Sequence, residues 1–299
     1  MSTTRDATTD TARRTETTAR PAGPADSIRQ VVVLVTSVLA IVAAFIGSGA
    51  FVGTPIQQAA GGWLDADSTL IAPGRPAFSI WSVIYTGMLA YAIWQLLPAQ
   101  RTDARHRRIG YAVAASLVLN ALWIGVVQLD LLGMSLPVIV VLLAVLAWLF
   151  VQLRRMPPKN LVDTIVTDGS IGLYLGWVVV ATAANATALL AAADFSGWGL
   201  PQETWAVIVI AAAAAVGVGL AVWGRGRIAP MLSLCWGLSW VAVARLTDQP
   251  ESTTTGIAAV VAVVVVVLAT LGARLLAMRT GRAGDAGRTD PSVAERATT

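Results

Sequence analysis

The stretch VVVLVTSVLAIVAAFIGSGAFV, residues Val31–Val52, contains no charged side chain over its whole length. A helix that crosses a bilayer needs about 20 apolar residues, because the hydrocarbon core is about 30 Å thick and a helix rises about 1.5 Å per residue. Seven further stretches of the chain meet this requirement, so we predict eight transmembrane helices. Their approximate spans are Val31–Val52, Phe78–Leu97, Ile109–Gln128, Leu132–Leu153, Ile165–Leu190, Trp205–Trp223, Ile228–Ala244 and Gly256–Ala273.

The composition of the chain favours the same fold class. Of the 299 residues, 56% are apolar and 13% are charged, against about 45–50% and 25% in a soluble domain. Asp168 is the one acidic or basic residue within the eight spans. A single cysteine excludes a disulfide framework, and with a single histidine it argues against a zinc site. We therefore predict an all-α protein, a polytopic membrane helix bundle.

The basic residues alternate between the connections, which predicts the orientation of the chain. Arginines gather in the N-terminal arm, in the second, fourth and sixth connections and in the C-terminal tail, whereas the other connections are acidic or poor in charge. Short cytoplasmic loops retain Lys and Arg. We expect a multi-pass protein of the cell membrane with both termini in the cytoplasm. Because the membrane explains where the arginines lie, we expect no nucleic-acid partner.

Two terminal segments differ from the rest of the chain. Residues 1–27 are rich in Thr, Ala, Arg and Asp and carry almost no large apolar side chain. Such a segment cannot bury enough surface to become ordered. We predict a disordered cytoplasmic arm over residues 1–27 and a disordered cytoplasmic tail over residues 277–299.

Three of the predicted helices carry aromatic and amide side chains at helical spacing. Trp81 and Tyr85 are four residues apart in the second span, so they share one face of the helix. Asn120 and Trp123 are three residues apart in the third span. The fifth span carries a stripe of Tyr174, Trp177, Ala181 and Asn185.

These stripes allow two interpretations. In the first, Asn120 and Asn185 form hydrogen bonds with neighbouring helices, worth about 0.6 kcal/mol each on average, while the aromatic rings fill the core. In the second, the stripes converge on a cavity that binds a flat apolar ligand, since such cavities combine apolar walls with a few polar groups. Part of the excess of 11 tryptophans also belongs to the membrane interfaces. The spacing leaves both interpretations open.

At these residues the sequence resembles the TspO/MBR family, the tryptophan-rich sensory proteins of bacteria. The W-x-x-x-Y segment is matched by Trp81 and Tyr85, with Pro73 before them, and the L-N-x-x-W segment by Leu119–Trp123. The third segment, Y-L-x-W followed by A and N, is matched within Tyr174–Asn185. The three segments occur in the family's order on the second, third and fifth predicted helices.

The resemblance implies a five-helix membrane unit over residues 28–190, followed by a three-helix membrane extension over residues 191–276. It also implies an integral membrane sensor or binding protein for a flat apolar ligand, such as a porphyrin or haem, with no required cofactor. The chain departs from the family pattern at Leu173, Arg75 and Ala77. The residues that would line an aromatic pocket under the first outer loop are Trp81, Tyr85, Asn120, Trp123, Trp177, Ala181 and Asn185.

Other functions have weaker support in the sequence. A transporter or carrier of small hydrophobic molecules is the alternative, with Asp168 as its candidate coupling group, although we expect Asp168 to cap a helix or face the interface. An enzyme is the least favoured class, because the spans hold no Ser-His-Asp set and we expect His106 to be a solvated loop residue. The resemblance leaves light-driven breakdown of a tetrapyrrole open, since that reaction would need only a tryptophan near the bound ring. The partners we expect are the lipid bilayer and a small hydrophobic or tetrapyrrole ligand. A homodimer is an open alternative to a monomer.

Overall fold

The computed structural model describes residues 21–47, 54–56 and 58–286, with side chains as far as residue 280. Every regular element among these residues is a helix. The long helices are α1 (Pro24–Gly47), α2 (Ile80–Trp94), α4 (Ala104–Gln128), α5 (Leu132–Arg155), α7 (Ser170–Ala192), α8 (Gln202–Trp223), α9 (Ile228–Thr247) and α10 (Thr253–Ala286). The short ones are η1 (Ala60–Gly62), η2 (Arg75–Ser79), α3 (Pro98–Arg101), α6 (Leu161–Asp163), the π-helical η3 (Thr164–Gly169) and η4 (Gly197–Gly199).

Eight helical segments in this described part of the chain are long and apolar enough to cross a membrane. They coincide with the eight predicted spans, so the prediction of a polytopic helix bundle is confirmed. The fifth span is continuous from Leu161 to Ala192, because α6 and η3 lead directly into α7.

Helix extends further into the terminal segments than predicted. α1 begins at Pro24, and α10 continues to Ala286. Asp26 is buried, and Arg107 donates two hydrogen bonds to its carboxylate, from Nε to Oδ1 and from Nη2 to Oδ2, both at 2.8 Å. Helix thus runs across the boundaries predicted at residues 27 and 277, while residues 1–20 and 287–299 of the two segments lie outside the described residues.

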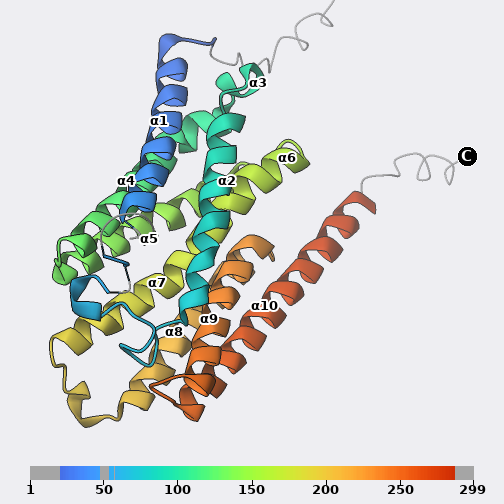
Figure 1. The fold of residues 1–299 in the computed structure, drawn as a ribbon. Helices are drawn as coiled ribbons and strands as arrows, with labels where there is room; N and C mark the ends of the chain where they lie inside the picture. The colour runs from blue at the N-terminus through green and yellow to red at the C-terminus, as the bar shows by residue number, and fades with distance from the viewer. Residues whose placement is uncertain (1–20, 48–53, 57, 287–299) are drawn as a thin grey trace, which may run out of the picture.

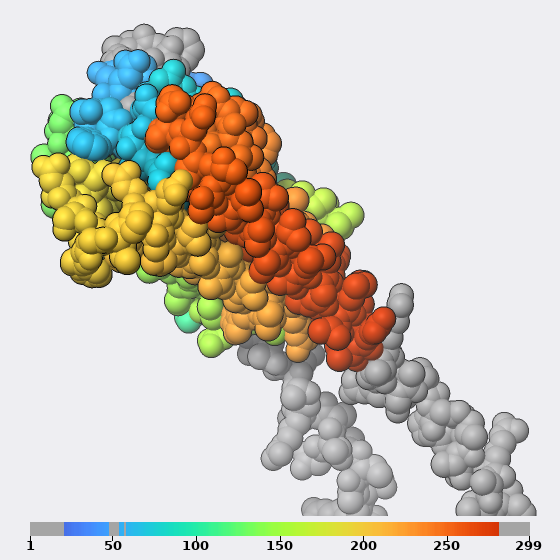
Figure 2. Space-filling view, turned by 90° about the horizontal axis from the view of Figure 1, so that it is seen from below, coloured from blue at the N-terminus to red at the C-terminus, as the bar shows by residue number. Residues whose placement is uncertain are grey.

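The helices pack in a chain of neighbours (Figure 1). α1 packs on α4 and α2, α4 on α5, and α5 on α7, while α7 also contacts α2, α8 and α9. α10 packs on α8 and α9 and lies along one side of the molecule (Figure 2). α1 begins and α10 ends at the same end of the bundle, which we call the termini end. The opposite end, which carries the connection between α1 and α2, is the loop end.

Glycines bring α7 and α9 close together. A Cβ atom on Gly176 would lie 2.1 Å from the carbonyl oxygen of Pro230 and 2.3 Å from Ser233 Oγ. On α9, a Cβ atom on Gly237 would lie 2.9 Å from a methyl group of Val180. Small residues allow this kind of close approach between membrane helices, where van der Waals packing drives association. The α7–α9 contact therefore joins the first five spans to the last three.

We predict that Gly176→Ala destabilises the protein by about 1–3 kcal/mol, because the added methyl group would overlap backbone atoms that cannot move separately. Thermal unfolding of the purified protein in detergent would measure the loss. Gly219→Ala is the matched control, since a Cβ atom there meets nothing within 4 Å. Equal stability of the two variants would contradict the close α7–α9 packing.

Candidate ligand-binding site

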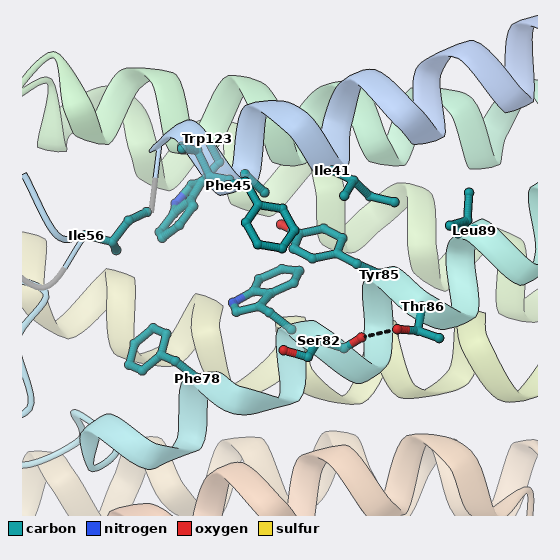
Figure 3. A pocket seen from close by; sticks show the side chains of 12 residues that line it. Ile41, Phe45, Ile56, Phe78, Ser82, Tyr85, Thr86, Leu89 and Trp123 are labelled. Atoms are coloured by element: carbon teal, nitrogen blue, oxygen red, sulfur yellow. Dashed lines mark hydrogen bonds between the residues drawn. The ribbon is translucent and has the colours of Figure 1, made fainter. Parts of the chain in front are cut away.

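A cavity of about 380 Å³ lies between α1 and α2 (Figure 3). η2 and α2 together supply half of its lining, and α4 closes one end. Phe45 projects from α1 over the ring of Tyr85 (Figure 3). The lining residues are Ile41, Ala44, Phe45, Ile56, Phe78, Trp81, Ser82, Tyr85, Thr86, Leu89, Trp123 and Ile124.

The two aromatic residues predicted on α2 form one wall of this cavity. Trp81 and Tyr85 are one helical turn apart, and their rings stack with centroids 5.2 Å apart and planes inclined by 21°. Trp81 also meets Tyr174 and Trp177 of α7 edge to face, with centroids 5.9 and 6.2 Å apart. Offset stacks and edge-to-face pairs are the favoured aromatic geometries. Pro76, in the first turn of η2, suits the start of this helical segment, which places the rings near the loop end.

The predicted amide of α4 lies behind the cavity wall. Asn120 is buried and lines neither cavity of the aromatic region. Its Nδ2 donates a hydrogen bond of 2.7 Å to the hydroxyl oxygen of Tyr85. Asn120 therefore holds the phenol ring in place.

The amide of α7 links three helices. Asn185 Oδ1 accepts a hydrogen bond of 2.7 Å from Nε1 of Trp123 on α4. Its Nδ2 donates one of 2.8 Å to Oγ of Ser135 on α5. Both predicted amides thus form hydrogen bonds between helices, as the first interpretation of the stripes expects. They form these bonds next to a cavity with aromatic walls, which the second interpretation expects.

A second, smaller cavity of about 40 Å³ lies under residues 58–74, which we call the roof loop. Three predicted residues of α7 line it: Trp177, Ala181 and Asn185. Trp123 lines both cavities, as do Ile56 and Phe78. The roof-loop residues over it are Trp63, Leu64, Ser68, Thr69, Ala72 and Pro73.

The structure therefore brings the predicted residues into one region but divides them between two cavities. Trp177 is 1% exposed and meets Phe78 edge to face at 5.8 Å. Phe78, Ser82 and Thr86 were not predicted, although their spacing from Trp81 and Tyr85 places them on the same helical stripe. Phe45 of α1 was not predicted either, because no pattern in the sequence distinguishes it from the other apolar residues of α1.

An ion pair and a hydrogen bond attach the two ends of the roof loop. Arg75 donates hydrogen bonds to both carboxylate oxygens of Asp65, at 3.0 and 2.7 Å. These bonds hold the pKa of the Asp65 carboxyl below its usual range. At the other end of the loop, the Ala60 N–H donates to Asp130 Oδ1 at 2.8 Å.

Asp168 and His106 lie at the termini end of the bundle and line neither cavity. Arg105 and Arg227 each donate to the Asp168 carboxylate, and Arg105 also pairs with Asp163 at 2.6 Å. A carboxylate shared by two arginines suits a structural role better than the coupling role in a transporter.

The prediction that His106 is a solvated loop residue is wrong. α4 already begins at Ala104, with Asp103 accepting hydrogen bonds from the backbone N–H groups of Arg105 and His106. The imidazole is 1% exposed, and its ring centroid lies 5.8 Å from that of Tyr91. Burial opposes ionisation of Asp103, but its bonds to Lys159 and to these N–H groups outweigh burial and lower its pKa.

We predict that Asn185→Ala lowers the free energy of unfolding by about 0.6–1.7 kcal/mol, because two interhelical hydrogen bonds are lost within the membrane. Denaturant or thermal unfolding in detergent would measure the change. Thr182→Val on the same helix is the control, since the Thr182 hydroxyl, among the described residues, bonds to the Val178 carbonyl one turn away. The three-helix link would be contradicted if the two variants were equally stable.

Comparison with known proteins supports the resemblance on which this site was predicted. The family described as TSPO-like protein matches residues 5–272. The match continues past Leu190, where we expected the resemblance to end, and includes α8, α9 and most of α10. Neither the curated proteins nor the solved structures gave a match. The family match covers most of the length of the chain, so the chain belongs to the TSPO-like family.

Proposed function

We propose that this membrane protein is a sensor or binding protein for a flat apolar ligand of the porphyrin class, bound in the cavity between α1 and α2. The observation that carries the proposal is the stack of Trp81 and Tyr85 on the wall of a cavity of about 380 Å³. This volume falls within the range of about 300–1,000 Å³ that small-molecule sites occupy.

The chemistry of the walls suits a flat ring with few polar groups. Phe45, Phe78 and Trp123 add further aromatic surface to the Trp81–Tyr85 wall. The polar groups around the cavity are few, chiefly the hydroxyls of Ser82, Thr86 and Tyr85. A ring system can bury its apolar faces against such walls while its polar substituents meet the hydroxyls.

The position of the cavity suits a ligand that arrives from the bilayer. Phe45 is 55% exposed, and Ser82 and Thr86 are also exposed, at the opening between α1 and α2. These helices are membrane spans, so this opening faces lipid. An apolar ligand can therefore enter from the membrane without crossing the roof loop.

The lining favours a metal-free porphyrin over a haem held through its iron. The one histidine and the one cysteine of the chain, His106 and Cys235, line neither cavity. A haem would therefore find no His or Cys ligand there. Metal-free protoporphyrin IX is accordingly the probe for the experiments below.

The location that we propose is the cell membrane, with the termini end in the cytoplasm. Arg29, Arg105, Arg107, Arg154 and Arg227 lie at this end of α1, α4, α5 and α9. Cytoplasmic ends of membrane helices carry such an excess of arginine and lysine. A homodimer stays a prediction.

We predict that Trp81→Ala raises the Kd for protoporphyrin IX by about tenfold or more, because it removes both a stacking surface and buried apolar area. The half-saturation point of tryptophan fluorescence quenching in lipid nanodiscs measures Kd without depending on the number of tryptophans. Trp198→Ala is the matched control, since Trp198 is 79% exposed in the α7–α8 connection. An equal Kd for the two variants would contradict the proposed binding site.

We also predict that Ser82→Phe weakens protoporphyrin IX binding by about tenfold or more, because the new ring occupies space that the ligand needs. Ser82 is exposed, so the variant should fold normally. Ser79→Phe, nearly one turn earlier and outside both cavities, should bind as the wild type does. The same titration applies, and undiminished binding by Ser82→Phe would place the ligand elsewhere.

A further inference from the structure

A buried arginine on α9 holds the roof loop. Arg245 is 1% exposed, and it lies near the loop end of α9. Its Nη2 donates to the carbonyl oxygen of Ala66 at 2.7 Å, and its Nη1 to that of Thr69 at 3.3 Å. Nη1 also donates to the carbonyl oxygen of Pro250 at 2.9 Å. One guanidinium thus joins the roof loop, α9 and the connection to α10.

Further contacts attach α9 to the end of the roof loop and to η2. The Gly74 N–H donates to the carbonyl oxygen of Trp240 at 3.2 Å, and Trp236 Nε1 donates to that of Ala77 at 2.9 Å. A Cβ atom on Gly74 would lie 3.3 Å from the Trp240 ring, so glycine permits this approach. Ile71 is buried in the same apolar cluster as residues of α8, α9 and α10. The last three spans therefore form the support on which the loop rests.

The chemistry of Arg245 makes this support specific. A buried guanidinium without hydrogen-bond partners is costly, because it loses its hydration. Among the described residues, the Arg245 side chain bonds to three backbone carbonyl groups, and two of these carbonyls belong to the roof loop. If the loop moved away, Arg245 would keep only the Pro250 carbonyl. The burial of this charge therefore favours the closed loop.

The held segment is also the one that covers the smaller cavity. Thr69 gives its carbonyl oxygen to Arg245 and lines that cavity as well. Ala66, the other acceptor, lies between Trp63 and Ser68, which both line it. Displacement of the loop would thus uncover Trp123 and Trp177, which lie below.

We propose that Arg245 is the positioning residue of the roof loop, and that α8, α9 and α10 serve to keep this loop closed over the smaller cavity. The proposal does not rest on the proposed function, because the ligand cavity between α1 and α2 opens toward lipid and is not lined by the roof loop.

The test of loop positioning needs no ligand. Hydrogen exchange of the roof-loop amides would be compared in the wild type, Arg245→Gln, Arg245→Lys and Arg154→Gln. We expect exchange over residues 58–74 to be about tenfold faster or more in Arg245→Gln, because two bonds to a charged donor are lost. Arg245→Lys should lie between the two, since it keeps the charge but has fewer fixed donors. Arg154→Gln, which removes an arginine bond of 2.6 Å to the Trp223 carbonyl elsewhere in the bundle, should match the wild type.

Exchange in α4 and α5 reports whether each variant is folded. Unchanged roof-loop exchange in a folded Arg245→Gln would overturn the proposal. If Arg245→Gln does not fold, Arg245→Lys decides, and wild-type exchange in its roof loop would overturn the proposal in the same way.

Discussion

Polar groups between membrane helices must bond to one another, because no water reaches them in the hydrocarbon core. In this protein the constraint falls on the amides of α4 and α7. Asn185 joins α4, α5 and α7 through Trp123 and Ser135, and Asn120 bonds to Tyr85 of α2. The same bonds fix the rings that wall the two cavities. The interactions that hold the helices together therefore also orient the aromatic surfaces of the site.

Arginines hold the two ends of the bundle by different chemistry. At the termini end, Arg105 and Arg227 share the carboxylate of Asp168, a fixed side chain on a continuous helix. At the loop end, Arg245 bonds to backbone carbonyl groups of a connection. Helix-to-helix ion pairs resist movement, whereas a connection can leave its partner by local opening. This difference places the movable part of the molecule over the smaller cavity.

The sequence predicted the spans well, because hydropathy over about 20 residues depends on the bilayer and little on the fold. It also predicted that Trp81 and Tyr85 share a face, since helical spacing is local. Spacing could not give the partner of a side chain, so Asn120 was expected in the pocket and lies behind Tyr85. Phe45 and the buried His106 were missed for the same reason, because tertiary contacts alone decide what α1 and the start of α4 face.

The position of α7 explains how the last three spans, which lie outside the aromatic region, can act on that region. One stripe of this helix, through Trp177 and Asn185, faces the smaller cavity, and an adjacent stripe through Gly176 contacts Pro230 of α9. α9 in turn holds the roof loop through Arg245. The smaller cavity thus lies between two surfaces that are both anchored to α9, one through α7 and one through the loop. A shift of α9 would alter the floor and the cover of the smaller cavity together.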